Sequence, residues 1–431
     1  MSVLFLTPYY PPEVGAPQTR IYELAVRLHK KGHQVSVLTT FPNYPSGVVP
    51  KEWRRRLFWK GEDHGIKIYR TWSYATPNKG FYRRVLSQLS FVISSCLAGL
   101  FLPCVDAIIV ESPPLFDGFA GVFLSTLKRT PYIFNVADLW LDAAVQMGML
   151  RNPRLIRLAK KVESYFYRRS ARVFAVTSGV RQAIVDCGIP EQKVILFRNA
   201  ADTEFFAPLP PQPEVRHELG AKDEDLLVMY AGTLGMAQQV DAIVDAAALF
   251  HQEGNNAVQF VFLGDGSEKE NLERKVQNLG LSNVRFLGVH LKSRMPALLG
   301  AADCVLVSVR DLKVLESALP TKMFEAMACC KPVVLAARGE AAETLTEARA
   351  GVIAQPGDPL DIHDAIFKLQ QHPEQRHEMG QSGRAYVLAH FSRDQRAEQL
   401  STILDTLQSH QAVRLGEVDC LPAKTTAAER T

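Results

Sequence analysis

The sequence predicts an α/β protein in which two Rossmann-like domains face a central cleft. Two observations carry this prediction. Short apolar segments alternate with amphipathic ones, and the alternation restarts after the proline-rich linker at 208–215. Apolar strands that alternate with helices indicate a parallel sheet with helices on both faces. The 431 residues, 47% hydrophobic and 22% charged, are enough for two such domains.

The first domain is expected to span residues 1–200 and the second residues 215–390. In the first, the pattern predicts strands at 2–7, 33–40, 65–70, 106–112, 131–136 and 172–179, and helices at 19–32, from about 81, and near 117–129. In the second, it predicts strands at 226–235, 258–266, 303–309 and 331–337. A last helix at about 393–408 is expected to pack back on the first domain, and the polar tail 411–431 to be disordered.

Cysteine usage and the N-terminal residues indicate a cytoplasmic protein. The seven cysteines show no metal-ligand spacing, and several lie in apolar runs, which is typical of buried thiols in a reducing compartment. Residues 1–13 lack a basic region and are broken by prolines, so they do not resemble a signal peptide.

The charges are unevenly distributed. Residues 1–200 carry 27 Lys and Arg against 13 Asp and Glu, whereas residues 201–431 carry 22 against 32. A basic N-terminal half indicates an anionic partner on that side: a membrane surface, a nucleic acid or a phosphorylated substrate. Because no aromatic–basic platform accompanies the charge, we expect no nucleic-acid partner.

Open parallel sheets bind ligands beyond the carboxyl ends of their strands, so the turns there are the candidate site. Two glycine pairs occupy such turns in the second domain: Gly232 with Gly235, and Gly264 with Gly266, which flank Asp265. Each pair alone is common in strand-to-helix turns. Together they place two turns without bulky side chains at one edge of the sheet, which favours a nucleotide site.

Two residues of the first domain have two interpretations each. Gly15 lies near the start of the first helix, where it allows either close approach of a phosphate to the helix end or a plain turn. Asp138 follows the strand at 131–136. It is placed either to hold a sugar hydroxyl or assist proton transfer, or to cap the next helix.

The segment 319–334, LPTKMFEAMACCKPVV, suggests an anion site. Thr321 is expected to cap a helix that cannot start before Pro320, and Lys322 then lies at a helix N-terminus, where a cation is locally unfavourable. Lys322 and Glu325 share one helix face, and the small apolar residues that follow favour burial over a surface ion pair. Lys322 is therefore placed to neutralise a diphosphate, and Glu325 to accept two ribose hydroxyls.

These motifs together resemble the retaining glycosyltransferases of family four, which have the two-domain GT-B architecture. The resemblance covers about residues 1–408. It rests on PPEVGAP, KKGHQVSVLTTFPNYPSG, VADLW, YAGTLGMAQ, LGDGSEKENLE, RFLGV and LPTKMFEAMACCKPVV. The segments PNYPSG and PTKMFEAMA are most similar to the subgroup that builds bacterial O-antigen and colanic-acid repeats, including N-acetyl-fucosamine transferases.

The resemblance implies roles for several of these residues. Glu325 matches the second Glu of the family's E-x7-E motif, which binds the ribose. The first Glu falls on a serine in this chain, and Glu316, one residue out of register, is the candidate for the donor-sugar contact. Where many relatives have an Arg and a Lys in the glycine turn, this chain has Thr233 and Gln238. Lys322 is therefore expected to supply the positive charge.

The implied reaction transfers a sugar from a nucleotide diphosphate donor, with retention at the anomeric carbon. Uridine is the expected base and guanosine the alternative. Stabilisation of the leaving diphosphate would lower the barrier, with Asp138, Glu316 and Lys322 as the implied catalytic residues. No cofactor and no metal are expected. The one Asp-x-Asp pattern, Asp223–Asp225, lies in a charged run before a strand and indicates a solvated turn.

Residues 85–105 carry no charge over 21 positions and follow Arg83 and Arg84. Their length would permit a membrane span, but four Ser and a Gln favour a helix that is partly buried and partly dipped into a membrane. A plain buried helix is the alternative. Basic clusters at 54–56 and 151–161 would add attraction to the inner-leaflet surface. Peripheral association with the inner membrane and an undecaprenyl-diphosphate-linked acceptor would follow.

Two other functions remain open. A nucleotide-sugar 2-epimerase shares the architecture but needs no membrane-directed helix. A non-catalytic sugar-nucleotide binder would also keep Lys322 and Glu325, so these residues alone do not separate binding from catalysis.

Overall fold

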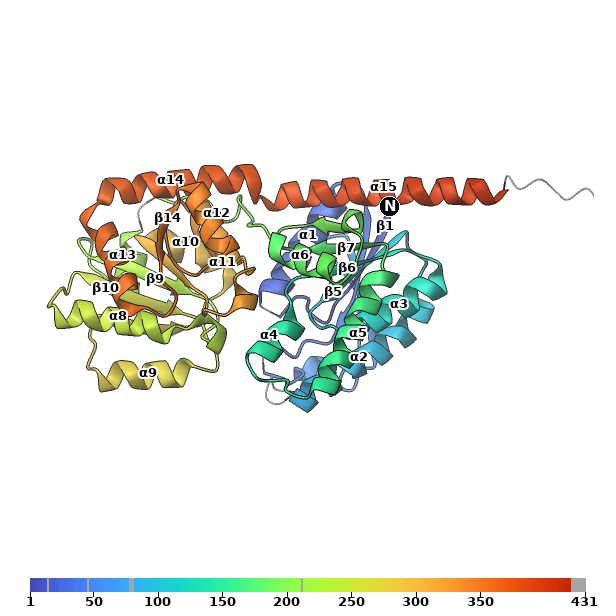
Figure 1. Ribbon diagram of the computed structural model, residues 1–431, viewed down its shortest axis with the longest axis horizontal. Coiled ribbons are helices and arrows are strands. Elements are labelled where there is room, and N and C mark those ends of the chain that lie inside the picture. Colours follow the sequence, from blue (N-terminus) through green and yellow to red (C-terminus); the bar gives the residue numbers. More distant parts are fainter. Residues whose placement is uncertain (14, 45, 77–80, 211, 420–431) are drawn as a thin grey trace, which may run out of the picture.

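The computed structural model describes residues 1–431 except 14, 45, 77–80, 211 and 420–431. Figure 1 shows two α/β domains side by side, bridged along one edge by the C-terminal helices. Each domain is a sheet with helices on both faces, so the predicted fold class is confirmed.

The first domain contains one sheet of eight strands in the described residues. The strands are β1 (Ser2–Leu6), β2 (Gln34–Thr40), β3 (Phe58–Asp63), β4 (Ile66–Thr71), β5 (Ala107–Ser112), β6 (Tyr132–Val136), β7 (Arg172–Ala175) and β8 (Val194–Leu196). The helices are α1 (Ala16–Lys30), α2 (Phe81–Phe101), α3 (Asp117–Lys128), α4 (Trp140–Gln146), α5 (Pro153–Arg169) and α6 (Ser178–Asp186), with 3-10 turns η1 (Lys51–Trp53) and η2 (Glu191–Lys193). The strand order is β3-β4-β2-β1-β5-β6-β7-β8, and every neighbouring pair is parallel except β3 with β4.

The second domain contains a parallel sheet in the order β11-β10-β9-β12-β13-β14. Its strands are β9 (Leu226–Ala231), β10 (Val258–Leu263), β11 (Val284–Gly288), β12 (Cys304–Ser308), β13 (Val333–Ala336) and β14 (Gly351–Ala354). Its helices are α7 (Pro213–Leu219), α8 (Asp241–Gln252), α9 (Lys269–Asn278), α10 (Met295–Ala301), α11 (Thr321–Ala328), α12 (Glu340–Ala348), α13 (Pro359–Gln371) and α14 (Pro373–His390), with 3-10 turns η3 (Met236–Gln238), η4 (Lys292–Arg294) and η5 (Lys313–Leu315).

The central strands are buried on both faces, as their continuous apolar sequences predict. Alternate side chains of β1 enter different clusters, because successive residues of a strand point to opposite faces of the sheet. Leu4 and Leu6 pack with residues of α2 and α3, whereas Val3 and Phe5 pack with residues of α1. Helices on both faces therefore fix β1 at the centre of the sheet.

The structure adds four strands to those predicted: β3, β8, β11 and β14. The strands β3 and β4 form an antiparallel hairpin whose two connecting residues, His64 and Gly65, have φ angles of 49° and 78°. Two consecutive residues with positive φ are what a two-residue hairpin turn requires. The sheet of the first domain is therefore parallel, as expected, except at this edge.

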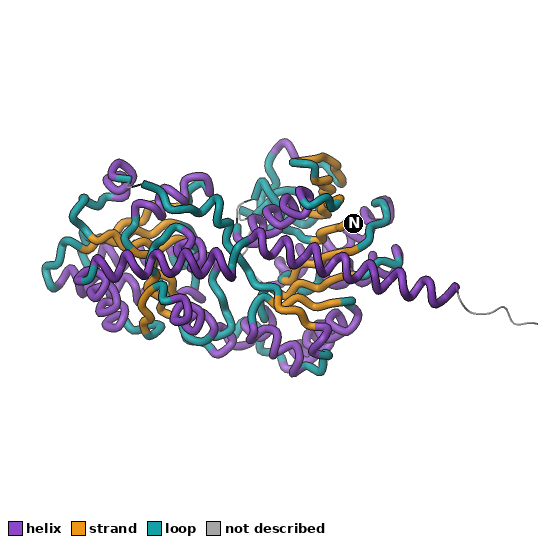
Figure 2. The backbone as a smooth tube through the Cα atoms, turned by 90° about the horizontal axis from the view of Figure 1, so that it is seen from above, coloured by secondary structure: helices purple, strands orange, loops and turns teal. Residues whose placement is uncertain are grey.

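The last helix, α15 (Arg393–Asp419), leaves the second domain and lies along the first (Figures 1 and 2). Ala397, Leu400 and Leu404 are buried against residues of α1 and β1. Residues 411–419, the beginning of the tail that is expected to be disordered, continue this helix. That segment is rich in good helix formers and contains no proline, so no residue there ends the helix at 411. The rest of the expected tail lies outside the described residues.

Candidate active site

The carboxyl ends of the strands in one sheet face those in the other. The N–H of Val314, after β12, donates to Oε1 of Gln146 in α4 at 3.1 Å. The first two amides of α6, at Ser178 and Gly179, donate to the carboxylate of Glu340, which follows β13, at 3.0 and 3.2 Å. Because these elements follow strands of both sheets, the turns singled out in the sequence lie where the domains meet.

The helix α11 begins next to this junction. Its N-cap is Pro320, in extended conformation, with no side-chain capping bond, so Thr321 is its first helical residue. The prediction that Thr321 caps the helix is therefore wrong. Pro320 takes the cap position itself, and a proline side chain has no oxygen to accept a bond from the first amides.

Lys322 lies between the end of β9 and the turn that follows it. Its Nζ is 4.0 Å from the centre of the Tyr230 ring, and a Cβ added at Gly232 would lie 3.5 Å from the same atom. Burial lowers the pKa of Lys322 to about 7, opposed by the negative charge of Glu325. The Tyr230 hydroxyl donates to the carbonyl of Thr233 at 2.7 Å, which ties the ring to the turn. The structure thus brings Lys322 to the glycine turn, as the sequence predicts.

The two glycine turns pack backbone against backbone. A Cβ on Gly264 would lie 1.8 Å from the carbonyl oxygen of Gly232, and one on Gly266 would lie 2.2 Å from that of Leu234. Gly232 and Gly264 also have φ angles of 146° and 143°. Both pairs lie at one edge of the sheet, as expected. Glycine is required at positions 264 and 266 because a side chain there would overlap the backbone of the other turn.

The polar residues of these turns are accessible. Thr233 and Asp265 are exposed, and Gln238, in η3, is half-buried. A Cβ at Gly235 would lie 2.9 Å from Oε1 of Gln238, so this side chain folds back over the turn. These groups can therefore donate to or accept from a ligand held at Lys322.

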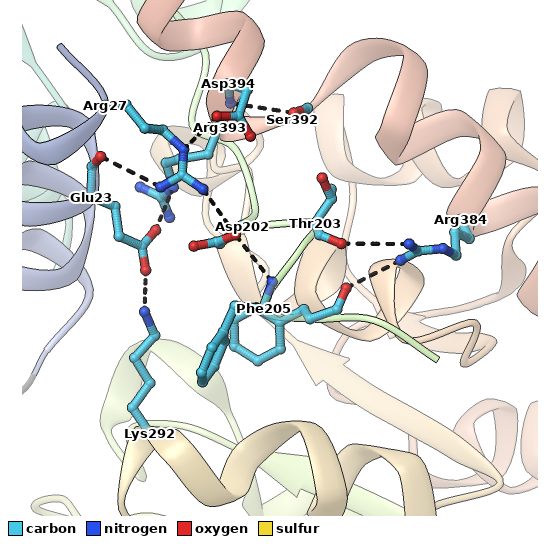
Figure 3. A network of polar contacts seen from close by, with 11 residues as sticks. Glu23, Arg27, Asp202, Thr203, Phe205, Lys292, Arg384, Ser392, Arg393 and Asp394 are labelled. Carbon is cyan, nitrogen blue, oxygen red and sulfur yellow. Dashed lines mark hydrogen bonds and ion pairs between the residues drawn. The ribbon is translucent and has the colours of Figure 1, made fainter. Parts of the chain in front are cut away.

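Glu325 lies one helical turn after Lys322, beside charges from both domains. Burial raises its pKa, Arg393 and Lys292 lower it, and Glu23 raises it. Glu23 of α1 pairs with Lys292 of η4, and Nε of Arg393 lies 2.8 Å from its Oε2 (Figure 3). Glu325 is therefore next to an ion-pair network that joins α1 to the second domain and to α15.

A second part of this network holds the interdomain connection. Arg27 of α1 pairs with Asp202 at 2.9 Å and with Asp394 of α15 at 2.8 Å (Figure 3). Arg384 of α14 donates to the carbonyl oxygens of Phe206 and Thr203 at 3.1 and 3.5 Å. The sequence gives no signal for these pairs, because their partners lie more than 170 positions apart.

Asp138 lies between β6 and α4, and α4 contacts η5 of the second domain. Its side chain reaches solvent, yet the surrounding protein raises its pKa to about 6, opposed by the charge of Arg20 and the N–H of Trp140. Arg20 itself pairs with Glu111 at 2.6 Å and donates to Asn199 at 3.1 Å. The N-cap of α4 is Leu139, with no side-chain capping bond, so the prediction that Asp138 caps this helix is wrong. With a pKa near 6, Asp138 can exchange a proton near neutral pH.

Glu316 and the residue after it differ in environment. Glu316 is exposed, and its carbonyl accepts the N–H of Glu340 at 2.9 Å. Ser317 occupies the motif position of the first Glu. A Cβ added at Gly179, in the first turn of α6, would lie 2.5 Å from the Cβ of Ser317. The serine thus packs closely on the first domain, while the neighbouring carboxylate remains free to reach a ligand.

Gly15 is the N-cap of α1 and has extended backbone, so no positive φ requires glycine there. A Cβ would lie 2.4 Å from Oε1 of Gln18, a flexible side chain. The structure places Gly15 at a helix N-terminus, as expected.

Among the described residues, no three His, Cys, Asp or Glu side chains come together as a metal site. Oδ1 of Asp223 lies 3.5 Å from Nε2 of His217, and Oδ2 of Asp225 accepts a hydrogen bond from the N–H of Lys222 at 2.8 Å. Both precede β9, at the opposite end of that strand from Lys322.

Two known families match most of the chain. Residues 15–200 match the family described as "Glycosyl transferase 4-like domain", and residues 211–386 match "Glycosyl transferases group 1". The chain is a two-domain family-four glycosyltransferase. It is 25% identical over 343 residues to the putative colanic acid biosynthesis glycosyl transferase WcaI of Escherichia coli (strain K12), an alignment that covers 76% of this glycosyltransferase and 81% of WcaI.

Solved structures show the same fold. Sucrose-phosphate synthase from Thermosynechococcus elongatus superposes with a TM-score of 0.75 and 18% identity, over 95% of this glycosyltransferase and 99% of that chain. HepE from Anabaena, solved in complex with UDP, gives a TM-score of 0.70 and 18% identity, over 94% and 100%. The predicted GT-B architecture is confirmed.

Proposed function

We propose that this glycosyltransferase transfers a sugar from a UDP-sugar to a lipid-linked precursor of a bacterial surface polysaccharide, with retention at the anomeric carbon. The observation that carries the proposal is the position of Lys322 and Glu325 on the first turns of α11, beside the glycine turn after β9. UDP in the HepE structure supports uridine, and the name of WcaI supports a polysaccharide product.

The chemistry follows from the charges at the junction. Lys322 and the N-terminal amides of α11 neutralise the diphosphate as it leaves, which lowers the barrier without a metal or another cofactor. Glu325 accepts the ribose hydroxyls. Asp138 binds the attacking hydroxyl across the domain junction, and Glu316 contacts the donor sugar. These four side chains come from two domains, so the reaction would take place where the domains meet.

The first domain also has a surface suited to an anionic membrane. One face of α2 exposes apolar side chains at helical spacing: Tyr82, Leu86, Leu89, Ile93, Leu97, Leu100 and Phe101. Neighbouring α3 adds exposed Phe119, Phe123 and Leu127. The helix α2 is long and apolar enough to span a membrane. One side of it packs on α3 and β4, but only 22% of its most apolar 18-residue segment is buried. It is therefore not the plain buried helix considered as an alternative.

Basic side chains flank this apolar face. The helix α5, which contacts α3 (Figure 1), exposes Arg154, Arg157, Lys161, Arg168 and Arg169. Basic residues near an anionic bilayer contribute roughly 1 kcal/mol each, and apolar side chains add a salt-resistant part. We propose that α2, α3 and α5 hold the enzyme on the cytoplasmic face of the inner membrane, where an undecaprenyl-diphosphate-linked acceptor is present.

A donor screen tests the reaction. The purified enzyme is incubated with a lipid extract and UDP-N-acetylfucosamine, UDP-N-acetylglucosamine or GDP-mannose, and the released nucleotide and the anomeric configuration of the product are measured. A product with the donor's configuration supports the proposal. Isomerised donor without acceptor would indicate a 2-epimerase, and binding without turnover would indicate a sugar-nucleotide binder.

A further inference from the structure

A cavity lies where the interdomain connection and α15 meet the first domain. It encloses about 470 Å³ of empty space and opens to solvent. Its walls come from α1, the strands β1, β5, β6 and β7, residues 197–200 and the beginning of α15. Lys322, Glu325, Asp138 and Glu316 do not line it. The cavity is therefore separate from the candidate active site.

Arginine side chains dominate the charge of this cavity. Four of the lining residues are arginines and one is a carboxylate: Arg20, Arg198, Arg393, Arg396 and Glu111. Three of the arginines have a carboxylate partner, which is Glu111 for Arg20, Glu340 for Arg198 and Glu23 for Arg393 (Figure 3 shows the last pair). The cavity thus has a surplus of positive charge.

Arg396 of α15 carries this surplus, since it has no carboxylate partner in the described part of the chain. Its terminal nitrogens donate to Oε1 of Gln399 at 2.8 Å and to the carbonyl oxygen of His390 at 3.3 Å, and both acceptors are neutral. Burial and the positive charge of Arg198 lower the pKa of Arg396, so its surroundings oppose its charge. An anion in the cavity would balance that charge.

Three buried polar atoms of the cavity wall have no hydrogen-bond partner among the described residues. They are Nε of Arg20, Nε of Arg396 and Oδ1 of Asn135. Asn135 is 4% exposed, and its Nδ2 donates to both oxygens of Glu111 at 3.0 and 2.9 Å, which leaves Oδ1 as the free acceptor. Buried groups of this kind destabilise the fold until a ligand or water completes their bonds. A ligand that completes all three has acceptor oxygens for the arginines and a hydroxyl for Asn135.

The rest of the lining is mainly apolar. It includes Phe5, Ile109 and Phe174 of the sheet and Ile21 and Leu24 of α1. Apolar walls exclude water, which strengthens the attraction between an anion and a guanidinium group. A guanidinium can also form two parallel hydrogen bonds to phosphate oxygens. These features together suit a compact phosphate group.

We propose that this cavity binds a phosphate group, as inorganic phosphate or as a small phosphomonoester. The phosphate oxygens accept hydrogen bonds from Arg20 and Arg396, and a hydroxyl of the ligand donates to Oδ1 of Asn135. Because Arg20 belongs to α1 and Arg396 to α15, the bound anion joins two helices that are distant in the sequence. It thereby holds α15, which leaves the second domain, on the first domain. This site is additional to the proposed transfer reaction and does not depend on it.

Titration with inorganic phosphate tests the site. Binding to the full-length enzyme is measured by calorimetry in HEPES at pH 7.5. Arg396→Gln is expected to weaken binding by about tenfold or more, and Arg396→Lys, which keeps the charge without the planar fork, to weaken it less. Arg274→Gln is the matched control, because Arg274 is exposed on α9 and does not line the cavity. Lys322→Met removes the cation of the donor site and is expected to bind phosphate as the wild type does.

Melting temperatures separate an anion site from an arginine that only supports the fold. Without phosphate, Arg396→Gln is expected to melt at or above the wild-type temperature, since it removes a partly buried charge that has no carboxylate partner. Phosphate should raise the melting temperature of the wild type and of Arg274→Gln but not that of Arg396→Gln. It should also slow hydrogen exchange in α15 of the wild type. A lower melting temperature of Arg396→Gln without phosphate, with no effect of phosphate on the wild type, would show a structural role alone.

Other anions identify the ligand. Sulfate has no hydroxyl at this pH and is expected to bind more weakly than phosphate, so equal affinities would refute the contact with Asn135. Tighter binding of glycerol 3-phosphate or glucose 6-phosphate than of inorganic phosphate would assign the site to a phosphomonoester, and weaker binding of both would assign it to inorganic phosphate. Absence of phosphate binding would overturn the proposal. Binding that Lys322→Met abolishes and Arg396→Gln retains would also overturn it, and would leave the proposed donor site standing.

Discussion

Lys322 should take up a proton when UDP binds. In the free enzyme, burial beside the Tyr230 ring lowers the pKa of this ammonium to about 7, because the negative charge of Glu325 compensates only in part for the lost solvation. A diphosphate at the N-terminus of α11 would supply that anion. The pKa of Lys322 should then return toward its ordinary value of 10.5.

The size of the effect follows from these two values. With a free pKa of about 7, about one Lys322 side chain in ten carries a proton at pH 8. If the bound pKa is near 10.5, each UDP takes up about 0.9 proton at pH 8 and about 0.5 at pH 7. Only the protonated form attracts the diphosphate, so affinity should be highest below pH 7. It should then fall about tenfold per pH unit as the pH rises above 7.

Calorimetry measures this uptake directly. The observed heat of UDP binding is compared at pH 8 in HEPES, Tricine and Tris, whose ionisation enthalpies differ, and the slope gives the number of protons taken up. At this pH the phosphates of UDP are already ionised, so the nucleotide contributes little. Lys322→Met keeps the apolar stem of the side chain, and it should abolish the slope and weaken binding by about 2–4 kcal/mol. A slope near zero in the wild type would refute the account of Lys322.

Four further outcomes follow. Glu325→Gln should weaken UDP binding by about tenfold or more in calorimetry, with an unchanged melting temperature, because it removes hydrogen bonds from the ribose to a charged group. Activity should persist in excess EDTA, and a loss that Mg²⁺ restores would contradict the metal-independent mechanism. Ile93→Glu with Leu97→Glu should abolish the salt-resistant part of binding to anionic vesicles in a flotation assay, while high salt releases the remainder, and absence of binding at low salt would remove the membrane proposal. Without ligand, Lys322→Met should melt at a higher temperature than wild type at pH 6, and the difference should shrink as the pH rises from about 7 to 10, since the folded state disfavours a charged Lys322.

The central strands and the meeting of Lys322 with Gly232 could be predicted from the sequence. Apolar segments of four to eight residues identify central strands, and parallel strands bring the turns that follow them to one edge. The edge strand β3 was not predicted. Its sequence, FWKGED, is exposed at alternate positions and mostly polar, so it resembles a loop until its hairpin with β4 is seen.

The buried charged side chains were less predictable than the turns of the donor site. Glu23 looks like a solvent-facing residue of an amphipathic helix, yet it is buried between Lys292 and Arg393 from distant parts of the chain. Asp117 looks like an ordinary acidic residue in a first helical turn. The structure buries it fully at the start of α3, and neither carboxyl oxygen has a hydrogen-bond partner among the described residues. Pairings of this kind depend on how the domains and loops assemble, which local sequence patterns do not encode.

A crystal structure of the enzyme soaked with UDP would test the donor site most directly. The diphosphate should lie within hydrogen-bond distance of Lys322 Nζ and the α11 amides, and both ribose hydroxyls should contact Glu325. A nucleotide bound elsewhere, or one whose diphosphate is held by a metal ion away from Lys322, would contradict the assignment of the donor site.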